Sequence, residues 1–408
     1  MKTCWRTGNH VELLENGEEF FPRVFETIHA AQREVLLETF ILEGDAVGRA
    51  LERALIDAAR RGVRVELTLD AWGSMRLPTA ILERMTAAGV CVHLFQLVPA
   101  WRLRIAWFRR LHRKLIVIDG VRAFVGGINF AADQVTNGEP GTKQDYAAEV
   151  RGPVVTDIHA LAAATVRAGH RTSPRLRGRR PEPDREQARA GDMLAGFVAR
   201  DNVRERTAIE RQYRHAIAAA RKRIIVANAY FFPGYRLLHG LRHAARRGVD
   251  VRLVLQGEPD LPWVQMGARM LYDPLLQSGV RIYEYCRRPF HGKVAIVDDE
   301  WATVGSSNLD PLSLALNLEA NIIVRDRRFT ADVSSRLERL MADDCTEVPA
   351  DPARSRIGWR PAVSALVYHF LRHFPQWSGR LPAHTPRLTP MPPGEDEPPA
   401  DRQPAWRR

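Results

Sequence analysis

Two segments of the chain carry the same set of residues that can do chemistry on a phosphate ester. Each segment reads H-x-K-x4-D, with His112, Lys114 and Asp119 in the first copy and His291, Lys293 and Asp298 in the second. Small residues and an asparagine follow each Asp, namely Gly126, Gly127 and Asn129, then Gly305, Ser306 and Asn308. A chain with two such segments can bring two histidines, two lysines and two asparagines to one point.

These residue types suit transfer of a phosphodiester without a metal. A neutral imidazole can attack phosphorus and form a covalent intermediate. A second, protonated imidazole can give a proton to the leaving alcohol, because an unperturbed histidine pKa of ~6.5 permits both forms near neutrality. Ammonium and amide groups can hold the phosphate oxygens as charge shifts. We therefore expect the six H-x-K-x4-D residues to be catalytic, and Gly127, Asn129, Ser306 and Asn308 to bind phosphate.

A nucleophilic histidine also needs its second ring nitrogen held, preferably by a carboxylate. Glu319 follows the second loop and is expected to orient His291, whereas Asp145 follows the first loop and is expected to orient His112. Glu149 competes with Asp145 for that role. For the two aspartates of the boxes a purely structural role at a turn stays open, since Asp-Gly and similar pairs favour tight turns.

The chemistry requires strands that present both side chains on one face. Residues two apart on a strand point to the same side, so each His and Lys leave together. An internal repeat surrounds the boxes: the sequence A-A-R-R-G-V occurs at 58–63 and again at 244–249, each time as a helix end, a glycine cap and a strand start. Alternating strands and helices predict an α/β fold, built as two tandem pseudo-repeated domains, each a mostly parallel mixed sheet flanked by helices, with the active site at their interface.

The expected domain boundaries follow changes in composition along the chain. Residues 1–170 and 191–345 are predicted to be the two domains, and the Pro- and Arg-rich stretch 171–190 a linker. Residues 346–380 contain an apolar, aromatic and basic run (357–377) that we interpret as a membrane-associating helix. Residues 381–408 are predicted to be a disordered tail. Residues 101–110 mix aromatics with arginines, so they are a second interfacial candidate, with a basic core helix as the alternative.

The overall composition narrows the kinds of binding partner and cofactor that we expect. The formal charge is +12, which favours nucleic acid, anionic lipid or a phosphate substrate, although the arginine excess can also be compositional. Only five lysines occur, and two of them are Lys114 and Lys293. The four cysteines lack metal or disulfide spacing, and no clustered ligands suggest a metal, so no cofactor is expected. The start lacks a secretory signal, and no apolar run approaches the ~20 residues of a spanning helix.

The paired motifs resemble those of the phospholipase D superfamily. Further segments, namely 38–45, 113–114, 230–233, 306–313 and 317–319, resemble those of the bacterial cardiolipin synthases, most closely their type B branch without N-terminal membrane spans. The resemblance implies transfer of a phosphatidyl group from one phosphatidylglycerol to another, giving cardiolipin and glycerol. It also implies that His112 is the nucleophile and His291 the acid and then the base. Anionic phospholipids and a membrane surface, at the cytoplasmic face of the cell membrane, are the expected partners, and nucleic acid is not.

Three alternatives remain at this point. A nucleic-acid phosphodiesterase would share both boxes and the basic charge, and would add stacking aromatics along a groove. A hydrolytic phospholipase D would share the boxes and release phosphatidic acid to water. A non-catalytic scaffold would require a broken box, and both boxes are intact.

Overall fold

The computed structural model describes residues 3–95, 109–135, 141–172, 188–257, 268–310, 313–314, 316–350 and 388–391. The first half of the chain contains β1 (Trp5–Glu15), α1 (Asn16–His29), β2 (Glu34–Thr39), α2 (Ala46–Arg60), β3 (Arg64–Asp70), α3 (Thr79–Ala87), β4 (Cys91–Phe95), β5 (Leu115–Ile118), β6 (Arg122–Gly126), the short 3-10 helix η3 (Ala132–Gln134), β7 (Tyr146–Arg151) and α4 (Val155–Thr172).

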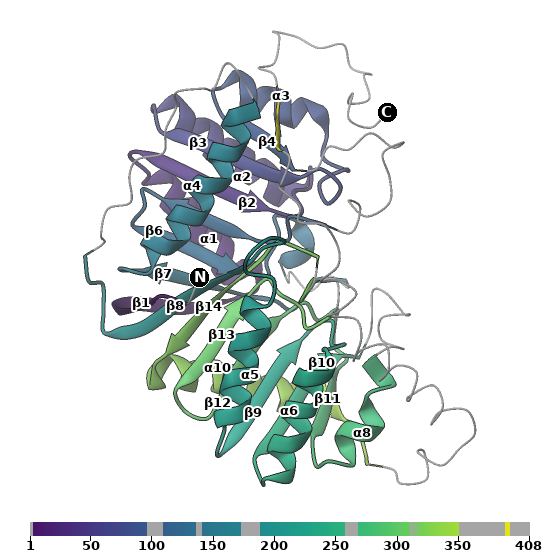
Figure 1. Ribbon diagram of the computed structural model, residues 1–408. Coiled ribbons are helices and arrows are strands. Elements are labelled where there is room, and N and C mark those ends of the chain that lie inside the picture. The colour runs from purple at the N-terminus through teal and green to yellow at the C-terminus, as the bar shows by residue number, and fades with distance from the viewer. Residues whose placement is uncertain are drawn as a thin grey trace.

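The second half repeats this order closely. It contains β8 (Met193–Arg200), α5 (Ala208–Ala219), β9 (Arg223–Asn228), α6 (Tyr235–Arg246), β10 (Asp250–Gln256), α8 (Tyr272–Leu276), β11 (Arg281–Tyr285), β12 (Lys293–Val297), β13 (Trp301–Gly305), β14 (Glu319–Arg325), α10 (Arg327–Asp344) and β15 (Cys345–Glu347), and β16 (Leu388–Pro390) follows near the C-terminus. Figure 1 shows the halves as two lobes that meet where β1, β8 and β14 lie.

The repeated A-A-R-R-G-V sequence has the local structure that was predicted. Gly62 and Gly248 follow α2 and α6 with φ values of 87° and 88°, a left-handed conformation that glycine adopts without a steric penalty. Each glycine therefore ends its helix and turns the chain into the next strand, β3 or β10.

Within the described residues the strands form one mixed sheet of sixteen, in the order β15-β11-β10-β9-β12-β13-β14-β8-β1-β7-β6-β5-β2-β3-β4-β16. The α/β class and the mixed sheet are confirmed. The expectation of mostly parallel pairing is wrong, because only β2-β3-β4 and β9-β10-β11 are joined in parallel. The physical reason is the turn at the end of each box: it reverses the chain, so β5 and β12 pair antiparallel with β6 and β13.

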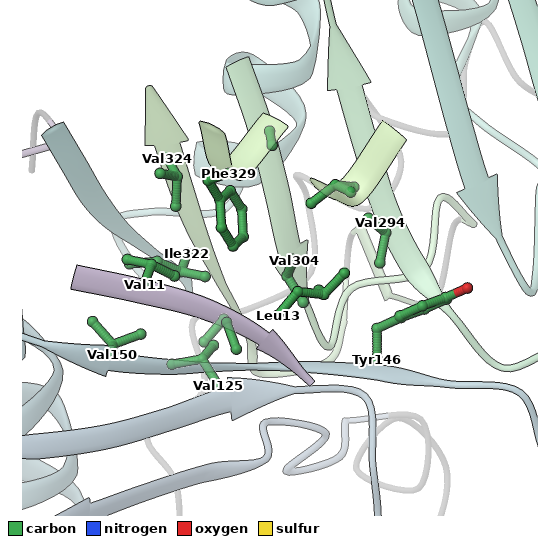
Figure 2. Packing of buried hydrophobic residues seen from close by; sticks show 14 of the residues in the cluster. Val11, Leu13, Val125, Tyr146, Val150, Val294, Val304, Ile322, Val324 and Phe329 are labelled. Atoms are coloured by element: carbon green, nitrogen blue, oxygen red, sulfur yellow. The ribbon is translucent and has the colours of Figure 1, made fainter. Parts of the chain in front are cut away.

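Two strands that the sequence patterns did not reveal connect the halves. The start of β1 pairs antiparallel with β8, with Trp5 opposite Gly196, while the rest of β1 pairs with β7. The largest apolar cluster spans the same junction. Figure 2 shows Val11, Leu13, Val125 and Val150 of the first half against Val294, Val304, Ile322 and Phe329 of the second. The halves share this core, so the position of one histidine segment relative to the other is fixed by packing.

The C-terminal expectations have mixed outcomes. Leu388–Pro390 forms β16 and pairs antiparallel with β4, so the prediction of disorder is wrong for these residues. The reason is local: Leu388 is buried against Phe95, which the polar composition of the surrounding tail concealed. The candidate membrane helix at 357–377, most of segment 101–110, most of the linker 171–190 and the rest of the tail lie outside the described residues. The domain boundaries remain predictions, although α4 runs to Thr172.

Candidate active site

Each histidine segment lies beside a chain segment from the other half. The backbone N–H of His112 donates to the carbonyl of Leu318 at 3.0 Å, and that of His291 donates to the carbonyl of Gln144 at 2.7 Å. Isolated parallel bridges, Leu111 with Leu318 and Gln144 with Phe290, mark the same two crossings. Both histidines therefore sit at the interface between the halves, next to the residues that precede β14 and β7.

The partner of His112 is Glu319. The imidazole Nδ1 lies 3.0 Å from one carboxylate oxygen of Glu319 and 3.2 Å from the other. Glu319 is fully buried, and the hydroxyl of Ser306 donates to its Oε2 at 2.5 Å. This arrangement fixes the His112 ring and leaves its Nε2 as the nitrogen that can meet a substrate.

The partner of His291 is Asp145. The imidazole Nδ1 lies 2.5 Å from Oδ2 of Asp145, whose other oxygen accepts the N–H of Tyr146 at 2.8 Å. Asn16, which has a positive φ of 58°, accepts the Asp145 N–H at 2.9 Å through its side-chain oxygen. A Cβ at Gly127 would lie 2.3 Å from Oδ1 of Asp145, so only glycine leaves room for this carboxylate.

The predicted pairing of histidines with carboxylates is therefore crossed. Glu319 was expected at His291 and Asp145 at His112, whereas each carboxylate contacts the histidine of the opposite half. The cause is tertiary: the segments before β14 and β7 run alongside the other half's box. Glu149 does not take part, since it accepts from Arg23 at 2.6 Å.

Two of the predicted phosphate ligands also support these carboxylates. Gly127 provides space for Asp145, and the Ser306 hydroxyl binds Glu319. Both therefore contact the carboxylate partner of a histidine, and their role in binding phosphate stays a prediction. Asn129 and Asn308 are buried at the ends of the loops that follow β6 and β13, and Asn129 Oδ1 accepts the N–H of Ile41 at 3.2 Å.

The two lysines are buried, and each donates to the backbone of the histidine in its own box. Lys114 Nζ donates to the His112 carbonyl at 2.9 Å, and Lys293 Nζ donates to the His291 carbonyl. Burial, and then the charge of Lys293, lower the pKa of Lys114 to about 7. The mutual repulsion of two ammonium groups indicates a site that attracts an anion.

Electrostatics differ between the two histidine–carboxylate pairs. Burial raises the pKa of Asp145 to about 6. Burial also acts to raise the pKa of Glu319, but the charge and hydrogen bond of His112, with Lys114 and Ser306, outweigh it and the pKa lies below the ordinary value. Burial lowers the pKa of both histidines. The pKa of His291 is lowered further by the nearby charges of Lys293, Lys143, Lys114 and His112.

Asp119 and Asp298 are placed at turns, away from the histidine ends of their strands. Each has a φ of 53°. Asp119 accepts the backbone N–H groups of residues 32, 33 and 34 at 2.7–2.9 Å, and Asp298 accepts those of residues 221, 222 and 223 at 2.7–3.1 Å. Each carboxylate therefore ties its hairpin turn to the start of β2 or β9, which agrees with the structural role left open above, and their catalytic assignment stays a prediction.

Sequence reasoning missed an aromatic neighbour of His112. The ring centroid of Phe40 lies 5.0 Å from that of His112, and Lys114 Nζ lies 5.3 Å from the Phe40 ring. Behind it, Arg113 and Glu38 form a buried ion pair at 2.9 Å. Glu38 and Phe40 lie at the end of β2, in the segment 38–45 that supports the family resemblance, whereas Arg113 lies inside the first box. No sequence pattern predicted the contact between Phe40 and His112.

Two kinds of feature are absent from the described residues. None of the helices there is long and apolar enough to cross a membrane. In the same ranges, no group of three or more His, Cys, Asp or Glu side chains is arranged to hold a metal ion.

Comparisons with known proteins agree with this geometry. A family model described as "Cardiolipin synthase, PLD-like domain" matches residues 24–144 and 213–341. Cardiolipin synthase B of Salmonella typhi is 50% identical over 395 residues, 96% of this chain and 95% of the relative. Cardiolipin synthase B of Escherichia coli K12 is 48% identical over 394 residues, with the same coverage.

Solved structures agree on the fold. The phosphatidylserine synthase of Haemophilus influenzae Rd KW20 aligns with a TM-score of 0.64 at 12% identity, covering 91% of this chain and 95% of that one. The polyphosphate kinase of Porphyromonas gingivalis aligns with a TM-score of 0.56 at 13% identity, covering 88% of this chain and 53% of that one. At such identities the likeness concerns the fold alone. With two histidine–lysine boxes at one interface and relatives that match along nearly its whole length, the chain belongs to the cardiolipin synthase family of phospholipase D-like phosphatidyltransferases.

Proposed function

We propose that the protein makes cardiolipin and glycerol from two molecules of phosphatidylglycerol, through a phosphatidyl group carried on His112. The observation that carries the proposal is the crossed pair of buried contacts, His112 with Glu319 and His291 with Asp145, above two buried lysines. Two oriented imidazoles and two ammonium groups supply a nucleophile, a proton donor and a phosphate-binding floor.

In the first step Nε2 of neutral His112 attacks the phosphorus of the donor lipid. The N–P bond forms as the bond from phosphorus to the glycerol oxygen breaks, and His291 gives that oxygen a proton, so glycerol leaves. Glu319 accepts the Nδ1 hydrogen of His112 throughout and stabilises the positive charge that grows on the ring.

In the second step the process runs in reverse with a new alcohol. A hydroxyl of the second phosphatidylglycerol gives its proton to His291 and attacks phosphorus. The N–P bond breaks and His112 returns to its neutral form, while cardiolipin leaves. Lys114, Lys293 and the amides of Asn129 and Asn308 are proposed to hold the phosphate oxygens during both steps.

The different carboxylates support this division of roles. A lowered pKa keeps Glu319 ionised, which suits a partner that must stabilise a positively charged phosphohistidine. The pKa of Asp145, raised to about 6 by burial, lies near neutrality, so the Asp145–His291 pair can release and regain one proton. A general acid that becomes a base needs this ability.

The proposal includes a membrane setting. The formal charge of +12 favours anionic phospholipid surfaces, and we propose a peripheral position at the cytoplasmic face of the bacterial membrane, without nucleic acid as a partner. Sedimentation with phosphatidylglycerol vesicles that weakens as salt is added would support this, because salt screens such attraction.

Product analysis tests the function directly. Purified protein would be given phosphatidylglycerol vesicles with and without a chelator, and the lipids and free glycerol would be measured. We expect cardiolipin and glycerol in equal amounts, and equal rates in both conditions. A product that is mainly phosphatidic acid would make the protein a phospholipase, and DNA cleavage without lipid turnover would make it a nuclease.

A further inference from the structure

An exposed aromatic turn stands beside His112. Trp72 and Met75 keep 55% and 43% of their surfaces exposed, which makes them two of the most exposed large apolar side chains in the described part of the chain. Large apolar side chains gathered at a reactive site are a usual mark of a ligand surface. The turn follows β3 directly, at the strand end that faces the box of the first half.

The turn is held rigidly in this position. Oδ1 of Asp70 accepts the N–H groups of Trp72 and Gly73, both at 3.0 Å, while Oδ2 accepts the N–H of Leu111 at 2.9 Å. The Ser74 hydroxyl donates to the Phe40 carbonyl at 3.1 Å. A Cβ at Gly73 would lie 2.3 Å from the same carbonyl, so the turn lies directly against residue 40. One buried carboxylate thus joins the Trp72 turn to the segment that carries His112.

Ring contacts lead from this turn to the reacting histidine. The Trp72 and Phe40 centroids are 6.2 Å apart, and Phe40 contacts the His112 ring edge-on at 5.0 Å. On the other side, the Arg110 guanidinium lies 5.1 Å from the Trp72 ring centroid. Arg110 precedes His112 by two residues, and in the second half its place before the box is taken by Pro289.

The positive charge of Arg110 is only weakly balanced by a neighbouring carboxylate. Its side chain is only 13% exposed, and in the described part of the chain its one ion pair is with Asp70, at 3.9 Å, beyond hydrogen-bond distance. Both oxygens of Asp70 already accept backbone N–H groups. Among the described residues its guanidinium forms an ion pair with Asp70 and a cation–π contact with Trp72. A mostly buried guanidinium in this state is suited to an additional anion, and phosphate matches its planar fork.

The proposed reaction needs such a place. The donor phosphate occupies the centre between the histidines and lysines, and the acceptor lipid brings a second phosphate, one glycerol bridge away from the hydroxyl that attacks. We propose that Arg110 binds the phosphate of the acceptor phospholipid, while Trp72 and Met75 support its acyl-glycerol part, so that this turn is the acceptor subsite. The inference rests on the proposed function and adds to it the element that selects a lipid over water.

Two acceptors test this assignment on the full-length protein. With phosphatidylglycerol alone, cardiolipin formation reports transfer to a lipid. With labelled glycerol added, its exchange into phosphatidylglycerol reports the same donor and the same phosphohistidine, with an acceptor that has no phosphate. KM for the acceptor and kcat would be measured for Arg110→Gln, Arg110→Lys and Trp72→Ala. Arg53→Gln, which removes an exposed charge on α2, is the matched control.

For Arg110→Gln we expect the KM of the lipid acceptor to rise about 10- to 100-fold, the range for a lost charged hydrogen bond, with glycerol exchange within about twofold of wild type. Arg110→Lys should fall between the two, because it keeps the charge without the fork. Trp72→Ala, at an exposed position that does not endanger folding, should raise KM more for long-chain than for short-chain acceptors.

Equal losses in both assays would overturn the subsite, because Arg110 would then act on the donor or on the fold. Unchanged cardiolipin formation in Arg110→Gln and Trp72→Ala would overturn it as well. Wild-type protein that makes phosphatidic acid in place of cardiolipin would overturn the proposed function together with the subsite, so the two failures are distinguishable.

Discussion

The two halves of the active site are built from the same motif but have different surroundings. His112 meets the longer side chain of Glu319, supported by the Ser306 hydroxyl, and has the Phe40 ring against its edge. His291 meets the shorter Asp145. Ala229, which follows β9 as Phe40 follows β2, places no aromatic ring at the corresponding position.

The repeated motif therefore supplies the reactive groups, whereas the residues around each histidine determine its role. An ionised carboxylate with a hydroxyl donor stabilises a histidine that must carry positive charge. A carboxylate with a pKa of about 6 suits a pair that exchanges a proton. The Trp72–Arg110 surface is a further departure from symmetry, since Pro289 replaces the guanidinium.

Removal of either histidine is expected to have the largest effect. His112→Ala and His291→Ala should each lower kcat for cardiolipin formation by about 10⁴-fold or more, and the double variant should be little worse, because groups that act as a unit are not additive. In His291→Asn a phosphatidyl group should accumulate on His112 and be located by mass spectrometry. An adduct on His291 would reverse the comparison of the two halves.

Replacing Asp145 or Glu319 by its amide should lower activity less than removing a histidine. The pH dependence of stability should also differ between the two variants. Asp145→Asn and Glu319→Gln should each lower kcat by about 10²- to 10⁴-fold, since the histidine tautomer is no longer fixed. The stability of the two variants relative to wild type should depend on pH with opposite sign. Chemical unfolding between pH 4 and 8 measures this.

The signs follow from the pKa shifts. The pKa of Asp145 is raised from 3.8 to about 6 in the folded protein, so its contribution to stability is present below pH 3.8 and lost as pH rises through 6. Relative to Asp145→Asn, wild type should lose about 3 kcal/mol over that window. The pKa of Glu319 is lowered, so its contribution is present above 4.5 and lost as pH falls. The same sign in both variants would contradict the asymmetry.

Lys114 should take up a proton when an anionic lipid binds. Its pKa of about 7 leaves it mostly neutral at pH 8, and a bound phosphate should restore the charge. Calorimetric titration with a short-chain phosphatidylglycerol, in two buffers of different ionisation enthalpy, should show uptake approaching one proton per site. Lys114→Arg should abolish the uptake and the exposed Lys222→Arg should preserve it. Equal uptake in Lys114→Arg would place the titrating group elsewhere.

The smallest effect on turnover is expected at the turn aspartates, where the halves are alike. Asp119→Ala and Asp298→Ala should each lower the free energy of unfolding by about 1–3 kcal/mol, because three backbone N–H groups lose their acceptor. Activity per folded molecule should stay within about twofold of wild type. A large loss of kcat with unchanged stability would support their catalytic assignment.

Local spacing along the chain is enough to show which residues can react. Spacing along a strand places His and Lys on one face, and the repeated glycine ends each helix, so these features depend only on neighbours in the chain. The same local reasoning predicted the other strands but not β1, β8, β15 or β16. The strands β1 and β8 join the halves, and their pairing across nearly two hundred residues leaves no local pattern.

Which carboxylate pairs with which histidine depends on the tertiary structure. Glu319 and Asp145 were identified from their position after each loop, but their partners lie 207 and 146 residues away along the chain. Side-chain spacing cannot indicate which half a segment will face, because the crossing arises from how the shared core packs the two halves against each other. The roles of Gly127, Ser306 and Phe40 were hidden for the same reason. Burial, which sets the pKa of Asp145 and Lys114, exists only once both halves have closed over them.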